Sequence, residues 1–242
     1  MMLRVFDKVV KVHGMLGIPI MTARERGIYK DVLLRLKEGG PLDIFEYGSG
    51  FSTVYFAKFL KRRGTAFHLH SVDNNAFWHG KVRAMADHAG VGAAVTLHLR
   101  TFEPFFKQAA WDENKPVVCG ALAPSSGAEE EYIRMPGTLG KKFDLIVVDG
   151  RFRRRCLLEV AAHLKPGGVV FLHDAEKKHY HASLSAYPRG VFIDGGKFYP
   201  LERRRHAVWV GGTDNAWVQT LAAKYGRSRR SFVPTKNVGT RD

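Results

Sequence analysis

The sequence predicts an α/β protein with a doubly wound, mostly parallel sheet and helices on both faces. Five short apolar segments alternate with helical segments, which is typical of parallel sheets. The first of these segments ends in a glycine-rich turn, and four of the five end in polar side chains. With 242 residues, 45% of them hydrophobic, the chain is long enough for one large domain with a substantial core.

The helices and strands can be assigned in chain order. The capping box Thr22-Ala-Arg-Glu25 predicts the start of a helix, and Gly39-Gly40-Pro41 predicts its end. Residues 143–148 are apolar on both faces, as expected of a central parallel strand. The expected parallel strands are 42–46, 66–72, 94–99, 143–148 and 169–172. Two further strands are expected at 191–193 and 207–210.

Three parts of the chain are expected to differ in organisation. Residues 1–21 form an amino-terminal segment without a clear pattern, residues 22–223 form the domain, and residues 224–242 form a basic tail. Within the domain, residues 101–140 are irregular, and a lid and a plain flexible insertion are alternative interpretations of them.

Composition limits the class of protein. Charged residues interrupt the apolar amino terminus, so neither a signal peptide nor a membrane span is expected. Cys119 and Cys156 are the only cysteines, too few for a metal quartet or a disulfide framework. We therefore expect a soluble protein of the reducing cytoplasm. The net charge of +15 indicates either a solvated basic surface or an anionic partner such as nucleic acid.

Polar groups gather where the predicted strands end. Gly48 and Gly50 follow the first strand, and glycines there let the backbone approach a ligand that faces the next helix start. Asp73 ends the second strand, where a carboxylate can bind the two hydroxyls of a ribose. Because ligands of open parallel sheets bind at the carboxyl ends of the strands, we expect a nucleoside cofactor there.

The ordered motifs resemble those of class I S-adenosylmethionine-dependent methyltransferases. They are Glu46-Tyr-Gly-Ser-Gly-Phe-Ser-Thr53, Val72-Asp73-Asn74, Phe143-Asp-Leu-Ile-Val-Val-Asp-Gly150 and Lys165-Pro-Gly-Gly-Val-Val-Phe-Leu-His-Asp174. The resemblance spans roughly residues 22–212 and implies seven strands, the last of them antiparallel. A nicotinamide dehydrogenase is the competing class, but it expects a third glycine where this chain has Thr53.

The resemblance also implies S-adenosylmethionine as the cofactor. The methionyl part would lie against the turn of Gly48, Ser49 and Gly50, with Glu46 anchoring that end, while Asp73 would hold the ribose. Asn74, Arg100 and Thr101 would border the adenine. Ser52 and Thr53 would bind the methionine carboxylate or, alternatively, cap the helix that starts there.

Three residues are candidates for catalysis: Asp149, His173 and Asp174. Methyl transfer requires alignment of the nucleophile and, for a hydroxyl, removal of its proton. Methyltransferases of the catechol type bind a divalent cation through acids after the fourth and fifth strands, the latter followed by asparagine. Asp149 and Asp174 occupy comparable places, but Ala175 stands where asparagine would be, so a cation is possible but not favoured.

The acceptor should enter near the Asp149 corner, which the arginine-rich stretch 151–155 follows directly. Arg151, Arg153 and His179 are the candidate acceptor-binding residues, with a solvated helix start as the alternative explanation of the arginines. We expect transfer to oxygen on a small-molecule or glycan-like acceptor, with an anionic acceptor as the functional interpretation of the arginines. The alternatives are an RNA methyltransferase or nucleic-acid-binding protein and a cofactor-binding protein without activity. The sequence lacks the Asn/Asp-Pro-Pro-aromatic signature of base-amine methylation, and neither cysteine follows a predicted strand. Both absences count against the RNA hypothesis.

Overall fold

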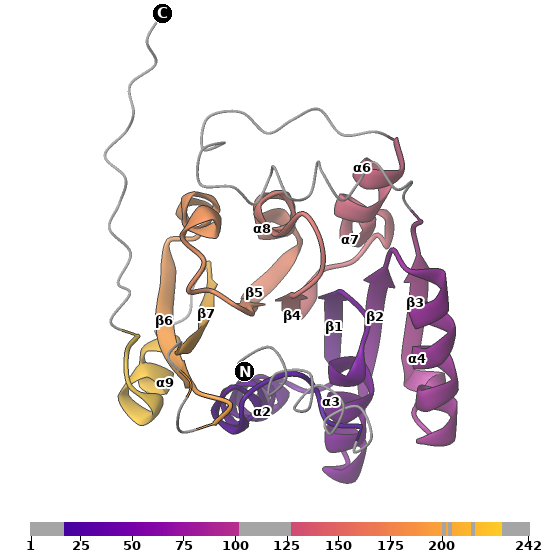
Figure 1. Cartoon of the computed structure of the whole chain (residues 1–242), viewed down its shortest axis with the longest axis horizontal. Helices are drawn as coiled ribbons and strands as arrows, with labels where there is room; N and C mark the ends of the chain where they lie inside the picture. The colour runs from indigo at the N-terminus through magenta and orange to yellow at the C-terminus, as the bar shows by residue number, and fades with distance from the viewer. Residues whose placement is uncertain (1–16, 102–126, 200–201, 203–204, 214–215, 229–242) are drawn as a thin grey trace, which may run out of the picture.

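The computed structural model describes residues 17–101, 127–199, 202, 205–213 and 216–228 (Figure 1). Its centre is a seven-stranded sheet in the order β3-β2-β1-β4-β5-β7-β6. The strands are β1 (Leu42–Tyr47), β2 (Phe67–Asp73), β3 (Val95–Leu99), β4 (Phe143–Val148), β5 (Leu164–Leu172), β6 (Arg189–Gly196) and β7 (His206–Gly212). β1 to β5 pair in parallel, whereas β7 is antiparallel to β5 and β6. The predicted fold class is thereby confirmed.

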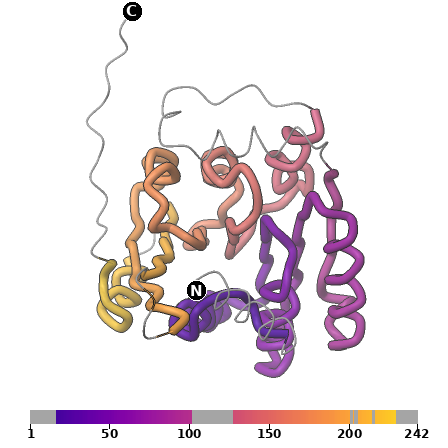
Figure 2. Tube along the Cα trace, viewed as in Figure 1, coloured from indigo at the N-terminus to yellow at the C-terminus, as the bar shows by residue number. Residues whose placement is uncertain are grey.

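Helices cover both faces of the sheet, and each face has its own apolar core. The first core joins α2 (Ala23–Leu36), α3 (Phe51–Arg62), α4 (Ala76–His88) and α9 (Val218–Tyr225) to the sheet. The second joins α6 (Gly127–Ile133), α7 (Met135–Thr138), α8 (Arg153–Val160) and the 3-10 segment η4 (Lys178–Ala186). α2 and α9, from opposite ends of the described chain, lie on the same face of the sheet (Figure 2). Short 3-10 turns occur at Lys37–Gly39, Gly92–Ala94 and Ala161–His163.

The predicted capping box starts α2. The Thr22 hydroxyl accepts a hydrogen bond from the Glu25 backbone N–H at 3.0 Å, and the Glu25 carboxylate accepts one from the Thr22 backbone N–H at 2.7 Å. Two otherwise unpaired backbone donors of the first turn are thus satisfied reciprocally. The Thr22 hydroxyl also donates a hydrogen bond to the Gly195 carbonyl of β6, which holds the amino-terminal end of α2, and with it the buried Glu25, against the sheet.

Strand register aligns the carboxyl ends of four strands. Tyr47 pairs with both Val72 and Val148, and Val148 pairs with Leu172. The residues that follow these positions, which are Gly48, Asp73, Asp149 and His173, therefore lie along one edge of the sheet. The pairing register therefore brings residues that are far apart in the sequence together at one site.

The structure extends several predicted elements. Residues 127–138 of the segment 101–140, expected to be irregular, form α6 and α7, and their side chains Tyr132, Ile133 and Met135 enter the second core. α9 continues to Tyr225, and Arg227 still bridges to β6, so order extends into the predicted tail. Residues 1–16, 102–126 and 229–242 lie outside the described residues, so the lid alternative stays a prediction. No described helix has the length and apolar character that a membrane span requires.

Candidate active site

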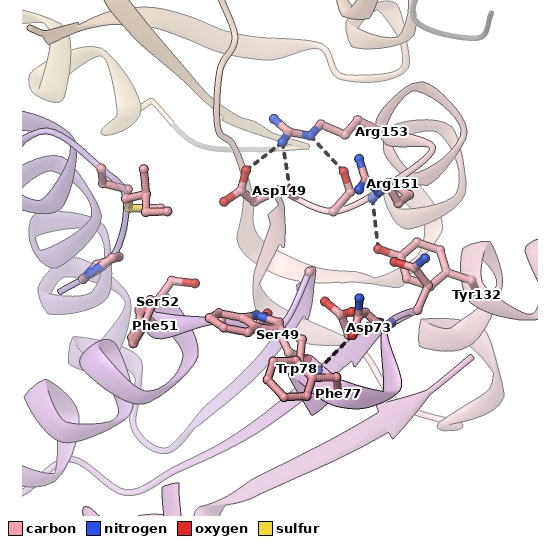
Figure 3. A pocket seen from close by; sticks show the side chains of 18 residues that line it. Ser49, Phe51, Ser52, Asp73, Phe77, Trp78, Tyr132, Asp149, Arg151 and Arg153 are labelled. Carbon is pink, nitrogen blue, oxygen red and sulfur yellow. Dashed lines mark hydrogen bonds and ion pairs between the residues drawn. The ribbon is translucent and has the colours of Figure 1, made fainter. Parts of the chain in front are cut away.

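A cavity of about 480 Å³ opens at the carboxyl edge of the sheet (Figure 3). Its volume lies within the range of roughly 300–1,000 Å³ found for small-molecule sites. Nine predicted site residues line it: Gly48, Ser49, Gly50, Ser52, Asp73, Asn74, Asp149, Arg151 and Arg153. Seven others do not line it: Glu46, Thr53, Arg100, Thr101, His173, Asp174 and His179. The cavity therefore brings the predicted cofactor turn and the predicted catalytic corner together.

Glycine is needed at positions 48 and 50 of the turn for two different structural reasons. Gly48 has φ +91°, and a Cβ there would lie 2.8 Å from the Cα of Gly150, because the loops after β1 and β4 touch. Gly50 has an extended backbone, and its Cβ would meet only Trp78 Nε1 at 3.6 Å and Ser52 Oγ at 3.9 Å. Gly48 is thus required by the fold itself, whereas Gly50 keeps the cavity open.

Glu46 is buried beneath the turn and does not reach the cavity. Its carboxylate accepts hydrogen bonds from the hydroxyls of Ser52 at 2.6 Å, Ser71 at 2.9 Å and Thr53. Burial raises the pKa of Glu46 to about 7, and the three hydroxyl donors only partly oppose this rise. Thr53 also accepts the Gly50 backbone N–H at 2.9 Å, as a helix cap does. A hydrogen-bonded link between Glu46 and a ligand in the cavity can therefore pass through Ser52, or through Ser71 and Ser49, whose hydroxyls lie 2.9 Å apart.

Asp73 faces the cavity from the end of β2. Its Oδ1 accepts the Asn75 backbone N–H at 2.7 Å, and burial raises the pKa of its carboxyl above the usual value. Arg100 donates its backbone N–H to the Asp73 carbonyl at 2.9 Å, but its guanidinium Nε pairs with Glu131 at 3.3 Å. Arg100 thus supports the strand end from outside the cavity.

The buried His173 and the half-buried Asp149 form a pair at the ends of β5 and β4. His173 Nδ1 lies 2.9 Å from Asp149 Oδ1, and its Nε2 lies 3.5 Å from Glu25 Oε1. Burial alone would lower the pKa of His173, but the carboxylates of Asp149 and Glu25 raise it well above its usual value. His173 is therefore an imidazolium at neutral pH. Burial would raise the pKa of Asp149, but His173 and Arg153 outweigh it and lower that pKa.

Arg153 is the first residue of α8 and lies against Asp149 (Figure 3). Its Nη2 is 2.8 Å from Asp149 Oδ1, and its Nη1 is 3.5 Å from Asp174 Oδ2. Asp174 has φ +55° and also pairs with Lys177 at 2.6 Å. His179 stacks edge-on against Tyr180, and burial followed by nearby cations lowers its pKa to about 4.

Several cavity residues were missed by sequence reasoning. Tyr132 comes from α6, in the segment expected to be irregular, and its hydroxyl accepts the Arg151 backbone N–H at 3.2 Å. Trp78 donates its indole N–H to the Ser49 carbonyl, and the Phe77 side chain at the rim is 80% exposed. Ile20 adds a further apolar side chain. The helical spacing of Trp78 was visible in the sequence, but nothing there showed which side of the helix faces a cavity.

Comparison with known proteins assigns the family. A family model described as a methyltransferase domain matches residues 45–175, more than half of the chain. The chain belongs to this methyltransferase family. The match contains the glycine turn, Asp73, Asp149 and His173, and it confirms the predicted class of S-adenosylmethionine-dependent methyltransferases. No curated protein sequence matches the methyltransferase.

Solved structures confirm the class I methyltransferase fold. An O-methyltransferase from Bacillus cereus in complex with SAH matches with a TM-score of 0.53 and 12% identity, covering 86% of this chain and 90% of that chain. The O-methyltransferase TomG from Streptomyces achromogenes, in complex with SAM, has a TM-score of 0.53 and 14% identity, covering 86% and 89%. Cofactor-bound Rv0187 from MTB has a TM-score of 0.52 and 13% identity, covering 87% and 89%.

Proposed function

We propose that this methyltransferase transfers a methyl group from S-adenosylmethionine to an oxygen atom of a small acceptor. The observation that carries the proposal is the single cavity in which Gly50 and Asp73 face the same space as Asp149. A cofactor site and a proton acceptor thus share one solvent-accessible volume. Two similar structures are described as O-methyltransferases, which agrees with transfer to oxygen.

The residues of the β1 and β2 ends suit the cofactor. The side-chain position of Gly50 opens into the cavity, so an elongated ligand can lie along the turn there. The Asp73 carboxylate borders the same cavity, and its oxygens can also accept hydrogen bonds from the hydroxyls of a ribose there. Ser49, Ser52 and Asn74 would complete the binding surface. When bound, S-adenosylmethionine supplies an electrophilic methyl group on its sulfonium.

Asp149 is the residue best placed to take a proton from an acceptor hydroxyl. Its Oδ1 is held by His173 and Arg153, while within the described chain no group donates a hydrogen bond to Oδ2. His173 is itself charged, so it orients Asp149 rather than accepting a proton. A carboxylate fixed in this way accepts a hydrogen bond from a hydroxyl and so favours transfer to oxygen.

The cavity wall indicates the kind of acceptor. Ile20, Met21 and Phe77 present apolar surface, and the exposed Arg151 adds a positive charge at the same cavity. This combination suits a small molecule with an apolar or ring-shaped body and an anionic group. The net charge of +15 favours nucleic acid as the second candidate acceptor.

A transfer assay tests the proposal. Methyl-labelled S-adenosylmethionine would be offered with phenols, carboxylated and phosphorylated sugars, short RNAs and cell extract. We expect O-methylated small-molecule products and a loss of at least about 100-fold in rate for Asp149→Asn, since proton removal by a placed base contributes 10²–10⁴-fold. Asp87→Asn, on the exposed side of α4, is the matched control. Methylation of RNA alone, or full activity of Asp149→Asn, would contradict the proposal.

A further inference from the structure

The acids after β4 and β5 occupy the places where catechol-type methyltransferases hold a divalent cation. Asp149 and Asp174 lie close enough for one group to bridge them, because Arg153 contacts both. Whether a cation fits here depends on what already stands between the carboxylates. In this chain that space holds a guanidinium.

The guanidinium of Arg153 is surrounded by oxygen acceptors. Its Nε donates to the Gly150 carbonyl at 3.1 Å, and its Nη1 donates to the His173 carbonyl at 2.8 Å and to Asp174 Oδ2 at 3.5 Å. Its Nη2 donates to the Asp149 carbonyl at 2.8 Å and pairs with Asp149 Oδ1 at 2.8 Å. Four oxygens thus accept hydrogen bonds from the five N–H donors of the guanidinium, and Asp149 Oδ1 adds an ion pair.

The surrounding charges also oppose a second cation. The Arg153 side chain is only 12% exposed, and Asp149 and Asp174 outweigh the effect of burial and raise its pKa, so it remains charged. His173 adds an imidazolium at Asp149, and Lys177 adds an ammonium at Asp174. A divalent ion would have to displace Arg153 and lie beside two further positive groups. The residues present do not fit the cation of the catechol type.

We propose that Arg153 is a built-in cation that replaces a divalent metal ion between Asp149 and Asp174. It neutralises the two carboxylates and fixes the Asp149 side chain at the cavity. The guanidinium is directed at these oxygens, so it does not offer an acceptor the open coordination position that a bound metal ion would offer. Arg153 is therefore a positioning residue, and the acceptor hydroxyl meets Asp149 rather than a metal.

This inference deepens the proposed function, but metal binding tests it without any methyl transfer. Removing the guanidinium should leave two carboxylates facing a vacated space that a hard cation can enter. Mn²⁺ titrations followed by electron paramagnetic resonance would compare the wild-type protein, Arg153→Ala and Arg153→Lys. We expect Arg153→Ala to bind one more Mn²⁺ than wild type. The lysine variant, which keeps the positive charge, should match wild type.

A second substitution locates the additional ion. In Arg153→Ala combined with Asp149→Asn, the extra Mn²⁺ should be lost. Asp174, Glu176 and His206 place ligand atoms within 4.8 Å of one another and could hold a metal ion in every variant. The readout is therefore the difference in bound Mn²⁺ between each variant and wild type. Should Arg153→Ala fail to fold, Arg153→Gln keeps some of the hydrogen bonds and removes the charge.

Two results would overturn the inference. One is a folded, neutral variant at position 153 that binds no more Mn²⁺ than wild type. The other is a Mn²⁺ ion on wild-type protein that Asp149→Asn removes. Neither result bears on whether the protein binds S-adenosylmethionine or transfers a methyl group, so failure here is distinguishable from failure of the proposed function.

Discussion

Glu46 allows a quantitative prediction about stability, because its carboxyl group is buried and forms no ion pair within the described chain. Burial raises its pKa from 4.5 to about 7. The folded state therefore favours the protonated carboxyl. Its contribution to stability is complete below the unfolded pKa and is lost as the pH rises from about 4.5 to about 7.

The size of the effect follows from the shift. A rise from 4.5 to about 7 corresponds to roughly 3 kcal/mol, most of which is lost between pH 5 and pH 8. The amide side chain introduced by Glu46→Gln cannot ionise. The free energy of unfolding of Glu46→Gln, relative to wild type, should thus increase by about 2–3 kcal/mol over that interval. Urea denaturation at a series of pH values measures this difference, and groups common to both proteins cancel.

Asp43→Asn is the matched control for this experiment. Burial alone would raise the pKa of Asp43, but hydrogen bonds from Lys141 and Lys165 lower it overall. Its stabilising effect is present above the unfolded pKa and is lost only as the pH falls, so the Asp43→Asn difference should stay flat between pH 5 and pH 8. Parallel curves for wild type and Glu46→Gln over that interval would refute the raised pKa of Glu46.

Two substitutions in the glycine turn should have separable effects. Gly48→Ala should lower the free energy of unfolding by about 2 kcal/mol or more, because φ is +91° and the new Cβ would lie 2.8 Å from Gly150; wild-type stability in urea would contradict this. Gly50→Ala should unfold as wild type does, because its Cβ meets nothing closer than 3.6 Å. It should nevertheless weaken S-adenosylhomocysteine binding by about 10-fold or more, since the new methyl group would occupy the space in which the ligand approaches the backbone of the turn; unchanged affinity would contradict this.

The strand-end edge could be predicted from the sequence because two local signals agreed. Apolar strands alternated with helices, and parallel pairing then required their carboxyl ends to meet. The observed register, with Tyr47 opposite Val72 and Val148, brings Gly48, Asp73 and Asp149 together as the pattern indicated. The part of the cavity that is proposed to bind the cofactor could therefore be predicted from the sequence alone.

Contacts between distant elements could not be predicted. His173 looked like a candidate base, but its pKa is raised by the carboxylates of Asp149 and of Glu25, and Glu25 reaches it from α2. Arg153 looked like an acceptor-binding residue because it follows the Asp149 corner, where an acceptor should enter, and because arginine at a helix start opposes the helix dipole. Its five oxygen partners come from the ends of β4 and β5, and only the packing of α8 against these ends shows them.

The helices of residues 127–138 could not be predicted from the composition of that segment either. An irregular segment was favoured by Pro104, Pro116, Pro124, the stretch Ser125-Ser126-Gly127 and the acidic run Glu129-Glu130-Glu131. Residues 127–133 and 135–138 nevertheless form α6 and α7. The buried side chain of Tyr132 holds this segment in the second core and brings it to the cavity. Tertiary packing overrode the weak local preference.

The central claim, that this cavity binds S-adenosylmethionine through Asp73, is tested most directly by calorimetry with S-adenosylhomocysteine. Two charge-assisted hydrogen bonds to the ribose are together worth about 3 kcal/mol or more, so Asp73→Ala should weaken binding by at least about 100-fold. Asp87→Ala, which removes the same charge from the exposed side of α4, should bind as wild type does. Absence of binding to the wild-type protein, or equal affinity for wild type and Asp73→Ala, would contradict the claim.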